Sequence, residues 1–263
     1  MLANAAMLLA VAVAAACGGA LAKEGVDMAR GRPERPSMQP SEGGRLRARP
    51  GPPAGDAPRG LQTLGPDGAR DGLLYVPASY EPAHPAPFAL MLHGAGGNAQ
   101  HGIYPFLDLA DGAGMILLAP DSRGPTWDLL RGGYGPDVAL ADRVLHEVFS
   151  RYAVDPAHLA VEGFSDGASY ALSLGLTNGD LFTHVLAFSP GFAAPAARAG
   201  QPRLFVSHGT RDAVLPIDQC SRRIVPALER AGYTVRYEEF DGGHTMPPEL
   251  VQAALTWLLN SPA

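Results

Sequence analysis

Short apolar runs bounded by glycine or proline alternate with amphipathic stretches along most of the chain. From about Gly60 onward, runs too short for a helix are typical of buried strands. We expect strands at 61–64, 72–76, 88–92, 115–119, 159–162, 184–188, 204–207 and 234–240. The stretches between them predict helices near 104–111, 137–152, 166–176, 218–231 and 248–259. This alternation predicts an α/β fold with a mostly parallel, eight-stranded sheet and helices on both faces.

The first 22 residues carry no charged side chain. The apolar run Ala5–Ala16, followed by Ala20–Ala22, is typical of an export signal with a small-residue cleavage site. Two alternatives stay open: Cys17 resembles the lipid-attachment site of a bacterial lipoprotein, and an uncleaved segment could anchor the chain in a membrane. We therefore expect residues 1–22 to be a signal peptide or lipoprotein signal, and the protein to be secreted or held in the cell envelope.

Residues 23–60 have a different composition from the rest of the chain. They contain fourteen glycines and prolines and hardly any bulky apolar side chain. Such a composition cannot bury a core, so we expect a flexible linker there. The remaining residues, 61–263, are long enough for one catalytic domain with a sizeable core.

The charge distribution bears on the partners of the protein. The net charge is −6, and the region outside 23–60 holds twelve basic against twenty-one acidic side chains. An acidic domain argues against nucleic acid as a partner. Cys17 and Cys220 are the two cysteines, so the mature domain cannot form an internal disulfide. No pair of residues has metal-ligand spacing, and we expect no metal.

The sequence Gly163-Phe164-Ser165-Asp166-Gly167 fits the G-x-S-x-G pattern of a serine nucleophile. An expected strand, 159–162, precedes it and an expected helix follows it, which is the strand–turn–helix context that exposes a serine hydroxyl on a strained turn. The alternative is a turn serine that only caps the helix.

A serine nucleophile needs a histidine base and an acid that orients it. Asp212 follows the expected strand 204–207, and His244 follows the expected strand 234–240, in the chain order serine, acid, histidine. Asp218 and Asp241 compete for the role of the acid. Asp218 is expected inside the following helix, and Asp241 lies in the loop of the base itself, so Asp212 is preferred.

The glycine-rich sequence His93–Asn98 follows the expected strand 88–92. Backbone N–H groups of such a loop can stabilise a developing oxyanion. We assign one donor to the N–H of Ala95, with Gly96 as the near alternative, and the other to the N–H of Asp166. A phosphate-binding loop is the competing interpretation, but the lysine of that motif is absent. His93 and His208 each begin a His-Gly turn and are expected to hydrogen-bond the backbone.

Together the motifs at 93–98, 163–167, 208–212 and 242–244 resemble the bacterial phospholipase/carboxylesterase family and its relatives among polyhydroxybutyrate-depolymerase-like and feruloyl esterases. The similarity covers about Arg45 to Leu259. It implies an α/β-hydrolase fold and a serine esterase without cofactor that acts on a small-molecule or polymeric ester. A serine peptidase of the prolyl-oligopeptidase type and a catalytically idle hydrolase-fold binding protein are the alternatives.

The substrate pocket is the least defined part of the site. Only twelve residues, Gly191–Pro202, lie where lipases of this fold commonly insert a helical lid, so we expect no large lid domain. For Trp127, pocket wall and plain packing are equal alternatives. The residues expected to line the pocket are Gly96, Trp127, Phe192, Leu215 and Met246.

Overall fold

The computed structural model describes residues 42–54, 56–65 and 71–260, all within one compact unit, Met38–Ala263. Its sheet consists of β1 (Gly60–Leu64), β2 (Gly72–Val76), β3 (Ala86–Leu92), β4 (Ile116–Pro120), β5 (Val154–Phe164), β6 (His184–Phe188), β7 (Arg203–Gly209) and β8 (Val235–Phe240). The helices are α1 (Ala99–Ala113), α2 (Pro136–Arg151), α3 (Asp166–Thr177), α4 (Ser221–Arg230) and α5 (Pro248–Leu259).

The eight strands form one sheet in the order β1-β2-β4-β3-β5-β6-β7-β8. β2 pairs antiparallel with β1 and with β4, and all the remaining pairs are parallel. The predicted mostly parallel sheet of eight strands is therefore confirmed. Because parallel strands end at the same edge, the loops after β3, β5, β7 and β8 gather at one side of the sheet.

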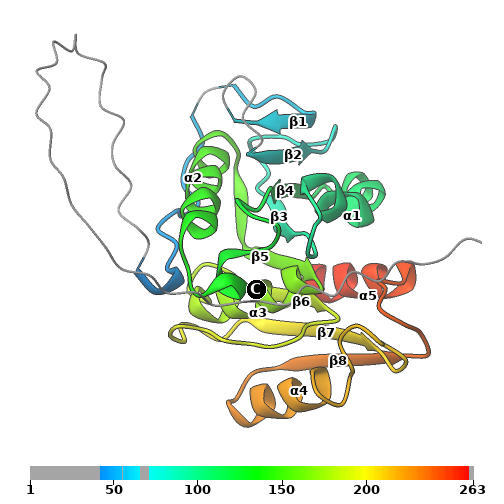
Figure 1. Ribbon diagram of the computed structural model, residues 1–263. Helices are drawn as coiled ribbons and strands as arrows, with labels where there is room; N and C mark the ends of the chain where they lie inside the picture. Colours follow the sequence, from blue (N-terminus) through cyan, green and yellow to red (C-terminus); the bar gives the residue numbers. More distant parts are fainter. Residues whose placement is uncertain (1–41, 55, 66–70, 261–263) are drawn as a thin grey trace, which may run out of the picture. The chain divides into compact units, whose positions relative to one another are not determined.

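Helices cover both faces of this sheet (Figure 1), as the sequence predicts. Successive side chains of β3 explain the two layers: Leu90 packs in the cluster with α2, α3 and α4, whereas Ala89 and Met91 pack in the cluster with α1 and α5. Strands buried on both faces must be apolar throughout, which is why the sequence shows continuous apolar runs.

Two helix starts differ from the predicted ones. α1 begins at Ala99, five residues before the expected start, because the Asn98 side chain accepts the N–H of His101 and caps the helix. α4 begins at Ser221, so Asp218 lies before the helix and not inside it.

Between β6 and β7, residues 189–202 form an irregular loop without a helix, in agreement with the expected lack of a lid.

The described part of the expected linker differs from a flexible tether. Leu46 is buried and its N–H donates to the side chain of Asn178 at 2.8 Å. Arg45 and Arg49 form ion pairs with Asp180 at 2.8 and 2.7 Å. The packed domain therefore begins well before residue 61. The composition of 23–60 conceals this because its buried apolar side chains, Leu46 and Ala48, are few and their partners lie far along the chain.

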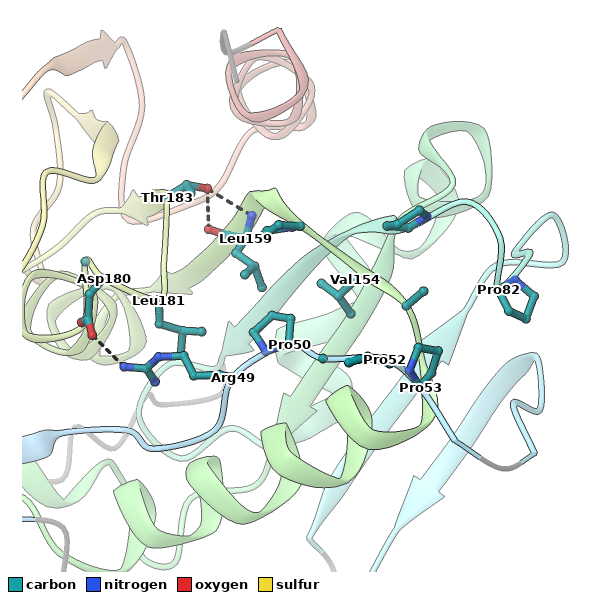
Figure 2. A pocket seen from close by; sticks show the side chains of 15 residues that line it. Arg49, Pro50, Pro52, Pro53, Pro82, Val154, Leu159, Asp180, Leu181 and Thr183 are labelled. Atoms are coloured by element: carbon teal, nitrogen blue, oxygen red, sulfur yellow. Dashed lines mark hydrogen bonds and ion pairs between the residues drawn. The ribbon is translucent and has the colours of Figure 1, made fainter.

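Residues Arg49 to Pro53 also line a hollow of about 580 Å³ at the start of β5 (Figure 2). Val154 and Leu159 of β5 form another part of its wall, and the ion pair of Arg49 with Asp180 lies at its edge. The hollow lies at the opposite end of β5 from Ser165, so it is separate from the predicted catalytic edge of the sheet.

The predicted signal or lipoprotein segment, 1–22, lies outside the described residues, so export stays a prediction. Within the described ranges, no helix is long and apolar enough to cross a membrane.

We predict that Leu46→Ala lowers the free energy of unfolding by about 2–4 kcal/mol, because it removes a fully packed side chain and leaves a cavity. Thermal or urea unfolding followed by circular dichroism measures the change. Arg47→Ala, at an exposed neighbouring position, should change it by less than about 0.5 kcal/mol. An equally small effect of Leu46→Ala would show that this segment is not part of the core.

Candidate active site

The backbone at Ser165 is the sharpest turn of the predicted site. Ser165 connects the end of β5 to the start of α3 with φ 58° and ψ −119°, a region that side-chain-bearing residues rarely adopt. Its N–H donates to the carbonyl of Phe188 at 2.9 Å. A Cβ at Gly163 would collide with the carbonyl of Gly167, and one at Gly167 with the carbonyl of Leu92. The two glycines of the motif are therefore required by close backbone approach.

Ser165, His244 and Asp212 lie in one chain of hydrogen bonds. The Ser165 hydroxyl donates to Nε2 of His244 at 2.8 Å, and Nδ1–H of His244 donates to Oδ2 of Asp212 at 2.6 Å. The loops after β5, β7 and β8 bring these side chains together from positions up to 79 residues apart. Such an arrangement can transfer a proton from the serine to the imidazole and hold the imidazolium that results.

The surroundings of Asp212 distinguish it from the competing acids. Asp212 is buried, and its Oδ1 accepts the N–H groups of Val214 and Leu215 at 2.9 and 2.8 Å. Burial acts to raise the pKa of Asp212, but the hydrogen bonds from His244, Leu215 and Val214 outweigh it, and the net shift is downward. Asp218 and Asp241 are exposed and form ion pairs with arginines.

His208, expected only to hydrogen-bond the backbone of its turn, is a second histidine at Asp212. Its Nε2–H donates to the carbonyl of Leu215 at 2.8 Å, as expected for a backbone contact, and also lies 3.2 Å from Oδ2 of Asp212. The Ser221 hydroxyl lies 2.7 Å from its Nδ1. Burial lowers the pKa of His208, which favours the neutral ring, with Nδ1 accepting from the Ser221 hydroxyl. These contacts hold His208 against the carboxylate of Asp212.

The loop His93–Gly97 lies beside the serine, where Gly94 approaches the Cβ of Ser165. The N–H of Gly96 donates to the carbonyl of Pro125 at 2.7 Å, so it is engaged within the protein. Within the described part of the chain, the N–H groups of Ala95 and Asp166 make no bond to a protein acceptor. Of the two alternatives for the first oxyanion donor, the geometry therefore favours Ala95 over Gly96.

The loop after β4 holds these donors in position. Trp127 donates its Nε1–H to the carbonyl of His93 at 2.8 Å, and the Thr126 hydroxyl donates to the Asp166 carboxylate at 2.7 Å. Trp127 is only 1% exposed and stacks on Tyr170. Of the two interpretations of Trp127, the structure places it in the packing behind the loop and not on a pocket wall.

The other residues expected to line the pocket separate into two groups. Gly96 and Met246 line a pocket of about 460 Å³ that also contains His244. Phe192 lines a different hollow near α4, and Leu215 lies beside Gly191. The structure therefore brings only part of the expected set together around His244.

Glu162 lines the same 460 Å³ pocket, although the sequence shows it only as the end of an apolar strand. It is 1% exposed, and its Oε1 has no hydrogen-bond partner in the described part of the chain. Burial raises the pKa of Glu162 well above its ordinary value of 4.5. An acidic residue within an otherwise apolar run, three positions before the serine, is the signal that could have singled it out.

Within the described ranges, no three histidine, cysteine, aspartate or glutamate side chains are grouped so that they could hold a metal ion.

The sheet order, the turn at Ser165 and the loops at the carboxyl edge define an α/β-hydrolase. Esterase PE8, a solved structure, has the same fold, with a TM-score of 0.60 at 23% identity over 72% of this chain and 97% of that one. The family described as putative esterase matches residues 137–255.

The sequence relatives of this α/β-hydrolase are esterases. Feruloyl esterase C of Emericella nidulans is 29% identical over 158 residues, which make up 57% of each chain, so the match spans little more than half of that relative. Probable feruloyl esterase C of Aspergillus niger is 27% identical over 225 residues, 72% of this chain and 82% of that one. The predicted resemblance to esterases of the α/β-hydrolase type is thereby confirmed.

The burial of Glu162 has a measurable consequence for stability. Because its pKa is raised in the folded state, the folded protein holds this proton more tightly than the unfolded chain, and stability falls as pH rises above the unfolded pKa. We predict that Glu162→Gln, which lacks this ionisation, gains Tm relative to the wild type by a few degrees as pH rises above the ordinary glutamate pKa of 4.5. Differential scanning calorimetry measures it.

Glu229→Gln, at an exposed position of α4, is the matched control. A Tm difference for Glu162→Gln that stays constant with pH, or that Glu229→Gln reproduces, would contradict the assignment of a buried, proton-holding carboxyl group.

Proposed function

We propose that the protein hydrolyses carboxylic esters through an acyl-enzyme on Ser165. The observation that carries this proposal is the hydrogen-bond chain from the Ser165 hydroxyl through His244 to the buried Asp212. The esterases among its relatives support the ester bond as the bond that is cleaved. These relatives favour an esterase over the two alternatives, a serine peptidase and a catalytically idle binding protein.

The geometry supports a two-step reaction. The Ser165 oxygen attacks the ester carbonyl carbon while its proton passes to Nε2 of His244, and the N–H groups of Ala95 and Asp166 hold the resulting oxyanion. The C–O bond then breaks, and His244 returns the proton to the leaving alcohol. A water molecule attacks the acyl-enzyme in the same way and releases the acid and the free serine.

The substrate class follows from the relatives and from the pocket. Two relatives are named feruloyl esterase C or probable feruloyl esterase C, so we propose that aromatic acyl esters, free or attached to a polymer, are among the substrates. The 460 Å³ pocket beside His244, with Phe164 and Met246 on its wall, has room for an aromatic ring.

We predict that Ser165→Ala and His244→Ala each lower kcat for p-nitrophenyl acetate by at least about 10⁴-fold, and that the double variant is hardly worse, because the two groups act as a unit. Asp212→Ala should lose nearly as much. Asp218→Ala removes an exposed carboxylate outside the triad and should keep wild-type activity within about twofold. Full activity in Ser165→Ala would refute the mechanism, and swapped results for the two aspartates would make Asp218 the acid.

The acyl-chain preference tests the open site. Without a helix in the loop 189–202, a long acyl chain gains little burial beyond the pocket, and each buried CH₂ contributes only about 0.8 kcal/mol. Hydrolysis of p-nitrophenyl esters should therefore peak at roughly two to eight acyl carbons, with no rate jump when the substrate forms an interface. A clear preference for chains of about sixteen carbons, or strong activation by emulsified triglyceride, would contradict this expectation.

A further inference from the structure

Glu162 has a carboxyl group that no interaction within the fold explains. It lies in the middle of the sheet, paired in register with Met91 of β3 and Leu186 of β6. Its side chain faces the layer of α1 and α5, and its Oε1 has no partner in the described part of the chain. Buried polar groups in native proteins are almost always hydrogen-bonded, and an exception requires a reason.

The pocket beside His244 supplies that reason. Its wall consists of the loop His93–Gly97, residues 101, 102 and 105 of α1, Phe164 of β5 and the loop His244–Met246, and Glu162 reaches it from the sheet. Because His244 lies on this wall and is hydrogen-bonded to Ser165, the pocket adjoins the place where an ester would be attacked. Glu162 therefore lines a space next to the reacting groups.

The other polar side chains of the pocket have partners or solvent. His93 contacts the carbonyl of Gly94 and the N–H of Ser122, and His244 is held by the triad. His101 and Thr245 are exposed to water. Among these side chains, Glu162 alone is both buried and left with unused hydrogen-bonding capacity.

The chemistry of the carboxyl group limits what it can bind. Burial raises the pKa of Glu162, which favours its protonated form, and a protonated carboxyl group offers one donor and one acceptor. A hydroxyl group has the same pair of functions and can satisfy both. An ammonium group would need an ionised carboxylate and would itself lose its water in a largely apolar pocket, which is unfavourable.

We propose that Glu162 is a specificity-determining residue that binds a hydroxyl group on the part of the ester that enters the pocket beside His244. This inference rests on the proposed ester hydrolysis and adds the class of substrate: esters whose acyl or alcohol part carries a hydroxyl. Such a site rejects an analogue without the hydroxyl, because the buried carboxyl group is then left unpaired.

Two pairs of substrates that differ by one hydroxyl test the proposal. The first is the ethyl ester of phenylpropanoic acid with its para-hydroxy derivative, and the second is phenylethyl acetate with its para-hydroxy derivative. We expect the wild-type kcat/KM to favour the hydroxylated member of at least one pair by about tenfold or more. The pair that shows the preference identifies the acyl or the alcohol part as the one in the pocket.

Variants then assign the preference to Glu162. Glu162→Leu, similar in size but without a hydrogen-bonding group, should reduce the ratio within that pair to about one, whereas Glu162→Gln, which keeps a donor and an acceptor, should retain most of it. Met246→Leu changes an apolar part of the same wall and should alter both members equally. If Glu162→Leu is poorly folded by circular dichroism, Glu162→Val, suited to a buried strand, replaces it.

A wild-type ratio near one in both pairs, or a preference that survives in Glu162→Leu and Glu162→Val, would overturn the proposal. Hydrolysis of p-nitrophenyl acetate and labelling of Ser165 by a fluorophosphonate are measured in parallel. If both occur without a hydroxyl preference, only the role of Glu162 fails. If neither occurs, the proposed function fails and the inference fails with it.

Discussion

The strained backbone of Ser165 is the constraint around which the rest of the site is arranged. A residue in this conformation costs on the order of 1–3 kcal/mol and persists only where its surroundings over-determine it. Here the carbonyl of Phe188 binds its N–H, and the carbonyls of Gly167 and Leu92 pack against the two flanking glycines. These contacts come from β3, β5, β6 and α3, so the buried centre of the sheet supplies the free energy that holds the turn. The serine hydroxyl is therefore in position before a substrate arrives.

The loops at the same edge of the sheet hold the other groups of the site in fixed positions as well. The backbone of the loop after β3 is held by Pro125 and Trp127, and Asp212 is held by Leu215 and His208. Since each group already has its partner, little reorganisation accompanies the movement of charge, and preorganised dipoles contribute most to such catalysis. The loop after β4 contributes none of Ser165, Asp212 and His244, yet its contacts with His93, Gly96 and Asp166 hold the backbone around Ser165.

The fold, and the hydrogen-bonded arrangement of Ser165, His244 and Asp212, were predictable because their signals are local. Strands buried on both faces produce continuous apolar runs, and Ser165, Asp212 and His244 each lie in a short motif directly after such a run.

The packing of Leu46 was not predictable, because its partner Asn178 lies 132 residues further along the chain. The role of Trp127 was left open for a similar reason: the sequence places it at the functional edge, and only the path of the loop turns its ring toward Tyr170. His208 was missed because only the fold brings it to Asp212. Glu162 stands out in the sequence as an acid in an apolar run, but only the fold shows that its Oε1 has no partner among the described residues.

Glu162 also shows why a local inconsistency carries information about function. A leucine or valine at this position would pack in β5 without the desolvation of a carboxyl group, and would suit the strand better. The position belongs to the strand that must hold the turn at Ser165, where a loss of stability is least easily tolerated. Natural sequences depart from such rules mainly at functional sites, where the gain lies in binding or catalysis and the loss is offset elsewhere. The unpaired carboxyl group is therefore better explained by a ligand of the pocket than by the folding of the sheet.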